Sequence, residues 1–167
     1  MRPSTVEGLE DSVASWAEMK EEGGAIAEYA DVMIEQFQVK LILLEYLLCQ
    51  YTIDGLRLTL KHRSGDAWGD LIPDAYQQGR FRWQAIQRDG FSGHCTHETP
   101  ELCIGDMVDD GYALLDMGPL DRLSATAEWQ RAMEIVAVIQ ACYAGQMSFE
   151  DAMRKREDIY SRYAKDA

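Results

Sequence analysis

The sequence predicts a mostly α-helical fold: a compact helical bundle of five or six helices, formed as a single acidic domain by residues 1–167. Three observations lead to this prediction. A length of 167 residues fits one domain that buries about 68–70% of its unfolded surface. The apolar fraction of 47% is ordinary for a globular protein. Apolar residues recur every three or four positions through most of the chain, which is the spacing of amphipathic helices.

The first two helices are predicted to form an antiparallel hairpin. Residues 5–22 form the first, with Val6, Leu9, Val13 and Trp16 on its apolar face. Gly23 and Gly24 end this helix, because glycine readily adopts the left-handed conformation at a C-cap. A second helix is expected over residues 25–51, with an apolar stripe formed by Ile26, Tyr29, Met33, Phe37, Leu41, Leu44 and Leu48. Its second half is apolar nearly all round, which predicts a place at the centre of the bundle.

The middle of the chain, residues 52–93, fits two interpretations. The segment 56–61 alternates between apolar and polar residues as a strand does, but Ile53, Leu56 and Leu60 also suit a short helix. We predict helical or irregular structure here, with a small β-hairpin within residues 55–90 as the alternative.

Three further helices are predicted in the C-terminal part. Thr99 and Pro100 form a cap and first turn, and the helix that they begin is expected to continue to Met117. The next helix spans residues 120–144. The last runs from a cap at Ser148 to about Tyr163.

The formal net charge of −13 is concentrated in two blocks. Residues 1–54 carry 3 basic and 11 acidic side chains, and residues 99–130 carry 1 and 7. Residues 55–98 and 131–167 are close to neutral. Direct binding to nucleic acid or to an anionic membrane is therefore not expected, because both need a basic face.

The charge pattern instead favours a non-enzymatic module that binds a basic protein surface. The type expected is an inhibitor: a phage anti-defence protein such as an anti-CRISPR, a nucleic-acid mimic, or an immunity protein that occludes a nucleic-acid-binding surface. The candidate partner-binding residues are acids from both blocks: Glu18, Glu21, Glu22, Glu28, Asp31, Asp106, Asp109, Asp110 and Asp116.

A first alternative function is enzymatic and rests on paired acids. Glu18-x-x-Glu21 and Glu28-x-x-Asp31 would each lie on one helix face, and the glycine turn would bring the two faces together. Four such carboxylates could hold Mg²⁺. The string from Glu28 to Ile34 resembles the second metal-binding helix of MazG-type nucleotide pyrophosphohydrolases. That resemblance implies Mg²⁺-dependent cleavage of nucleoside triphosphates by these four acids.

A second cluster contains histidine and cysteine. His94, Cys95, His97 and Cys103 could supply four zinc ligands, or a Cys–His nucleophilic pair. Their spacing matches no standard zinc motif, so a polar loop before the helix at Thr99 is the preferred interpretation. We therefore expect no catalytic residue, no bound metal and no cofactor, with Mg²⁺ only under the first alternative.

The remaining expectations concern location and assembly. The N-terminus lacks the pattern of a secretory signal, and the longest apolar run is about nine residues, far short of the ~20 that span a membrane. The four scattered cysteines indicate reduced thiols and a cytoplasmic protein. A third alternative is a helical assembly or adaptor protein, in which the helix over residues 25–51 pairs with a second copy to form a homodimer.

Overall fold

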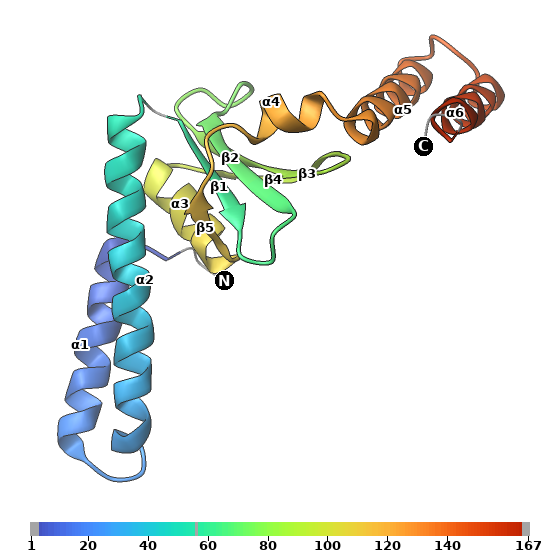
Figure 1. Ribbon diagram of the computed structural model, residues 1–167. Helices are drawn as coiled ribbons and strands as arrows, with labels where there is room; N and C mark the ends of the chain where they lie inside the picture. Colours follow the sequence, from blue (N-terminus) through green and yellow to red (C-terminus); the bar gives the residue numbers. More distant parts are fainter. Residues whose placement is uncertain (1–3, 56, 165–167) are drawn as a thin grey trace. The chain divides into compact units, whose positions relative to one another are not determined.

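The computed structural model describes residues 4–55 and 57–164, which form six α-helices and five β-strands (Figure 1). The chain is an α+β protein, so the predicted mostly α-helical bundle is wrong. The elements follow in the order α1 (Val6–Glu22), α2 (Ala27–Ile53), β1 (Leu58–His62), β2 (Ala67–Pro73), β3 (Phe81–Gln87), β4 (Gly90–His97), α3 (Pro100–Asp109), β5 (Tyr112–Leu115), α4 (Pro119–Ser124), α5 (Ala127–Tyr143) and α6 (Phe149–Tyr163).

All five strands belong to one sheet, with the order β4-β3-β2-β1-β5. Strand β1, next to the edge strand β5, pairs antiparallel with β2 and with β5, so that Leu60 lies opposite Gly69 on one side and Leu115 on the other. The helical or irregular structure predicted for residues 52–93 is therefore wrong over most of that range. The alternative, a small β-hairpin, accounts for only part of the four strands found there. Pairing between strands, which no local pattern reveals, decides the conformation of these short segments.

One face of the sheet packs against α2 and α3 and forms the hydrophobic core. Gly69 allows this close packing, because a Cβ atom there would come within 2.8 Å of the Met107 side chain on α3. Each large aliphatic side chain fully buried in such a core stabilises the fold by about 1.5–3 kcal/mol. The most deeply buried members are Leu44, Leu47, Leu58, Leu60, Leu71, Ile104 and Met107.

The predicted α1–α2 hairpin is confirmed. The Thr5 side chain caps α1 by accepting a hydrogen bond from the backbone N–H of Gly8. Gly23 and Gly24 both have positive φ angles, 79° and 84°, in the turn that reverses the chain. The two helices then run side by side along the first part of α2 (Figure 1).

The predicted cap at Thr99 is also confirmed, because its hydroxyl accepts a hydrogen bond from Leu102 N at 3.2 Å. The predicted extension of this helix to Met117 is wrong, since α3 ends at Asp109. Gly111 follows with a φ of 97°, and a Cβ atom there would lie 2.6 Å from the His62 ring. This turn sends the chain back along β1 as strand β5.

The helix predicted over residues 120–144 is in fact two helices. α4 ends at Ser124, and α5 begins after Thr126, whose hydroxyl accepts a hydrogen bond from Trp129 N. The last predicted helix is confirmed as α6, capped by the Ser148 hydroxyl.

The chain divides into two compact units. The first contains the chain up to Ala85 together with Gly93–Met117, and so includes α1–α3 and most of the sheet. The second contains Ile86–Ser92 and the chain from Gly118 onward. In the second unit Phe91 packs edge-to-face on Trp129, and α5 packs along α6. The residues of the candidate site all belong to the first unit.

None of the described helices combines the length and apolar composition that a membrane-spanning helix requires.

Candidate functional site

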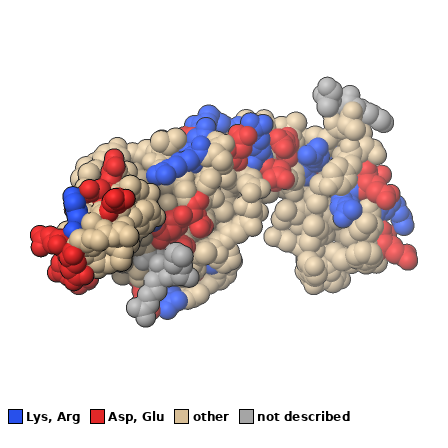
Figure 2. Space-filling view, turned by 90° about the horizontal axis from the view of Figure 1, so that it is seen from below, with Lys and Arg blue, Asp and Glu red and all other residues tan. Residues whose placement is uncertain are grey.

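The first acidic block gathers at one end of the α1–α2 hairpin. We call Glu18, Glu21, Glu22, Glu28 and Asp31 the acidic hairpin end. All five side chains are exposed, and Figure 2, which looks onto this end of the molecule, shows the acidic surface that they form. Among the described residues, only Lys20 pairs with one of them, through a salt bridge to Asp31. The hairpin end is therefore a concentrated negative surface.

An aromatic pair lies on the same hairpin. Trp16 of α1 and Tyr29 of α2 meet edge-to-face, with ring centroids 6.0 Å apart. Tyr29 is 56% exposed, and the neighbouring Ile26 is similarly open. The sequence places both residues on one apolar stripe of this helix, but in this first part of α2 the stripe is only partly covered by α1. The hairpin thus offers apolar surface next to its acids.

Two candidate acids of the second block, Asp106 and Asp109, make hydrogen bonds within the fold. Asp106 accepts a hydrogen bond from the indole N–H of Trp83 at 2.7 Å, and His97 Nε2 lies 2.9 Å from the same oxygen. Asp109 accepts hydrogen bonds from both the backbone N–H and the hydroxyl of Ser4. These two carboxylates fix strands and the N-terminal segment to α3.

The other two candidate acids of this block, Asp110 and Asp116, are also influenced by their surroundings. Asp116 accepts a hydrogen bond from the indole N–H of Trp68 at 2.9 Å. The pKa of Asp110 is raised, chiefly by burial and further by the negative charges of Asp106 and Asp109. A carboxylate that already serves an internal contact is less free to pair with a partner's cation.

The two acidic groups lie apart along α2. Lys40 forms an ion pair with Asp109, which places the C-terminal end of α3 beside the middle of α2. Lys40 follows Asp31 by nine residues, or about 13 Å at ~1.5 Å per residue. This distance exceeds the ~8 Å over which exposed charges act together in physiological salt. The acidic hairpin end is therefore a separate site from the acids of α3.

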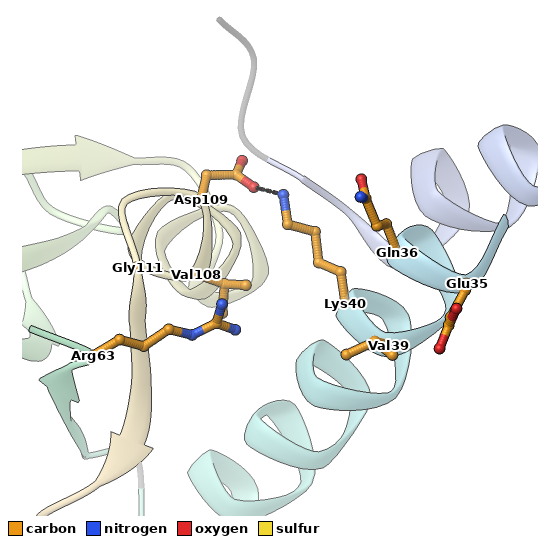
Figure 3. A pocket seen from close by; sticks show the side chains of 8 residues that line it. All are labelled: Glu35, Gln36, Val39, Lys40, Arg63, Val108, Asp109 and Gly111. Atoms are coloured by element: carbon orange, nitrogen blue, oxygen red, sulfur yellow. Dashed lines mark hydrogen bonds and ion pairs between the residues drawn. The ribbon is translucent and has the colours of Figure 1, made fainter. Parts of the chain in front are cut away.

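A cleft of about 440 Å³ lies at this junction between α2 and α3 (Figure 3). Lys40 reaches across it to Asp109, and Arg63 extends toward it from the turn after β1. The cleft is open and its charges are mixed, so it resembles a polar docking groove more than an enclosed catalytic pocket. Its lining consists of Glu35, Gln36, Val39, Lys40, Arg63, Val108, Asp109 and Gly111.

The four acids of the magnesium alternative lie on facing helices, as the glycine turn predicts. Asp31 forms its salt bridge with Lys20, while Glu18, Glu21 and Glu28 are exposed. Within the described residues, no group of three or more His, Cys, Asp or Glu side chains is arranged to hold a metal ion.

Three members of the histidine and cysteine cluster, Cys95, His97 and Cys103, lie close to Asp106, while His94 is set apart from them. His94 and Cys95 are neighbours in β4, so their side chains point to opposite faces of the sheet. Cys103 is fully buried in the core, and burial raises the pKa of its thiol to about 12. The pKa of the Cys95 thiol is also raised, chiefly by burial and then by Asp106. Raised pKa values disfavour the thiolate that a nucleophile or a zinc ligand requires.

Comparison of the chain with family models, curated proteins and solved structures gives no match. The fold itself defines the class: an α+β protein in which a helical hairpin carries an exposed acidic and aromatic surface.

Sequence reasoning found the acids of the hairpin but missed the surface around them. The exposure of Tyr29 depends on which face of α2 meets α1. Lys40 and Arg63 line one cleft only because α3 packs against α2 and the backbone N–H of Arg63 bonds to the carbonyl of Gly111, just after α3. Lys40 is one of only 3 basic residues in the acidic first block, and this scarcity was a signal in the sequence for an internal ion pair.

Proposed function

We propose that this chain is a non-enzymatic protein-binding module, an inhibitor that docks its acidic hairpin end on a basic nucleic-acid-binding surface of a partner protein. The observation that carries the proposal is the exposed Tyr29, packed on Trp16 and set among five exposed acids, of which Asp31 alone has a described cationic partner, Lys20. We also propose a cytoplasmic location, since all four cysteines are free thiols.

The two parts of this surface have different tasks in the proposed complex. The carboxylates accelerate association and select a cationic partner, because electrostatic complementarity acts mainly on the association rate and on specificity. The aromatic pair supplies affinity, since Trp and Tyr are enriched among residues that dominate binding energy. Arg and Lys side chains that normally contact phosphates would instead pair with Glu18, Glu21 and Glu22.

The experiment begins with capture of partners from the native host on immobilised chain at low salt. The affinity for a captured nucleic-acid-binding protein is then measured by titration calorimetry at about 50 and 300 mM salt. We expect the affinity to fall steeply at the higher salt. The chain should also compete with a labelled nucleic acid for that partner.

Matched variants separate the hairpin end from general acidity. The variant E18Q/E21Q/E22Q removes three charges from the hairpin, and E150Q/E157Q/D158N removes three exposed charges from α6. The first should weaken binding about tenfold or more, as should Tyr29→Ala, while the second should leave it unchanged. Equal effects of the two triple variants, or affinity that is independent of salt, would contradict the proposal.

A further inference from the structure

A second apolar stripe runs along α2 on the face turned away from the core. Its members are Val39, Ile42, Tyr46, Cys49 and Ile53, which alternate in steps of three and four residues. Val32 lies one heptad earlier. All of these residues are exposed, Ile42 by 66% and Ile53 by 67%. We call the five residues from Val39 to Ile53 the α2 seam.

The seam is distinct from the face of α2 that builds the fold. Leu44, Leu47 and Tyr51 are buried against the sheet and α3. The seam residues lie before, between and after these positions in sequence, and they project from the other side of the helix. α2 is thus apolar on two faces, and the contacts within the described chain cover one of them.

The spacing of the seam indicates what can cover it. Alternating steps of three and four give a period of 3.5 residues, which is the heptad pattern of a left-handed coiled coil. A partner that fits this pattern is itself an α-helix, because each apolar side chain must insert between four residues of a facing helix. In heptad terms Val39, Tyr46 and Ile53 occupy one core position, and Ile42 and Cys49 occupy the other.

We propose that the occupant is a second copy of this chain, so that the protein is a homodimer paired along α2. The charge of the segment permits this pairing. Between Val39 and Ile53 the charged residues are Lys40 and Glu45, so the seam itself is neutral although the whole chain carries −13. Two copies can therefore approach along the seam without the repulsion that the acidic hairpin ends would cause.

The size of the seam also fits self-association. The four larger seam side chains are exposed by about one half to two thirds, and with Cys49 the seam amounts to roughly 500 Å² per chain. Two copies would therefore bury on the order of 1,000 Å², the size at which specific interfaces begin. Two-fold dimers are the commonest symmetric assemblies, and they use the same patch on both subunits. The dimer does not depend on the proposed docking function, since the acidic hairpin end lies outside the seam.

The test measures the mass of the full chain in solution by sedimentation equilibrium between about 1 and 100 μM. We expect a species of twice 18.9 kDa that dissociates on dilution. Ile42→Glu and Tyr46→Glu place a charge in the seam and should weaken dimerisation at least tenfold. Because both residues are exposed in the single chain, circular dichroism and the Tm should show that these variants stay folded.

A control and a second measurement make the outcome decisive. Tyr143→Glu is the same substitution at an exposed tyrosine on α5, and it should leave the mass unchanged. Labelling of Cys49 by a maleimide should slow as protein concentration rises, because pairing covers the thiol. A monomer at 100 μM, or a dimer that survives both seam substitutions, would overturn the proposal, as would equal loss of the dimer in Tyr143→Glu.

Discussion

The backbone carbonyl of Ser4 crosses α3 at Gly105, so closely that a Cβ atom at Gly105 would lie 1.8 Å from the Ser4 oxygen. The N-terminal segment is fixed in this place by hydrogen bonds from Ser4 to Asp109 and from Val6 N to Glu101. A glycine within a helix costs about 0.5–1 kcal/mol relative to alanine. Here that cost is offset by contacts that only a residue without a side chain permits.

Gly105→Ala should therefore destabilise the protein, although alanine favours helices. The added methyl group forces Ser4 away from α3 and breaks its bonds to Asp109. We expect a loss of about 1–3 kcal/mol in the free energy of unfolding, the usual cost of overpacking, measured by urea denaturation. Gly93→Ala is the control, because a Cβ atom there meets no atom within 4 Å. Equal stability of wild type and Gly105→Ala would show that the N-terminal segment does not rest on α3.

A second prediction concerns Tyr51, where a conservative substitution should not lower the free energy of unfolding. Its hydroxyl is buried in the core and has no hydrogen-bond partner among the described residues. Tyr51→Phe removes this unsatisfied group and should leave the free energy of unfolding equal or raise it by about 1 kcal/mol. Tyr51→Ala removes the ring as well and should cost about 3–5 kcal/mol. A large loss in Tyr51→Phe would mean that the hydroxyl is bonded in solution.

The helical hairpin and the caps could be predicted from the sequence because their signals are local. Gly23 and Gly24, Thr99 before Pro100, and Ser148 each act within a few residues of their own position. The sheet could not be predicted in the same way. β1 has buried residues on both of its faces, Thr59 as well as Leu58 and Leu60, and its partners lie in two distant parts of the chain.

Only part of the candidate site could be predicted from the sequence, for the same reason. The acids of the hairpin end follow one another closely in sequence, and exposure is the ordinary state of a carboxylate. Whether Asp106 and Asp109 are free depends instead on Trp83, Ser4 and Lys40, which tertiary packing brings to them. Two apolar faces on α2 look the same in the sequence, and only the packing of the sheet distinguishes the buried face from the exposed one.

The cysteines should differ widely in reactivity toward a thiol reagent. Cys103 is fully buried and its pKa is raised to about 12, so it should stay unlabelled in the native protein. Cys49 and Cys95 are exposed, but the raised pKa of Cys95 should make it the slower of the two at low protein concentration. Mass spectrometry after timed labelling at pH 8 measures the order. Denaturant should make all the thiols react at similar rates, and rapid native labelling of Cys103 would contradict its place in the core.

The stability of the fold should depend on pH through the carboxyl group of Asp74. Its carboxylate accepts hydrogen bonds from Tyr76 N and Gln77 N in the turn after β2, and from Arg82 and Thr96 on β3 and β4. These donors, with Tyr76 N first, lower the pKa of Asp74 from 3.8 to about 2. Because the pKa is lower in the folded state, the carboxylate stabilises the fold above its unfolded pKa. That stabilisation is lost as the pH falls through about 2.

Asp74→Asn should therefore lower the Tm by several degrees at pH 7, since the neutral amide cannot replace a carboxylate that accepts four hydrogen bonds. The difference in Tm between wild type and variant should shrink as the pH falls from about 4 to about 2, where the wild-type carboxyl itself becomes protonated. Thermal unfolding followed by circular dichroism across this range measures the effect. Asp89→Asn, at an exposed turn residue, provides the control and should have little effect at any pH. A constant difference between wild type and Asp74→Asn from pH 7 to pH 2 would show that the charge of Asp74 does not stabilise the turn.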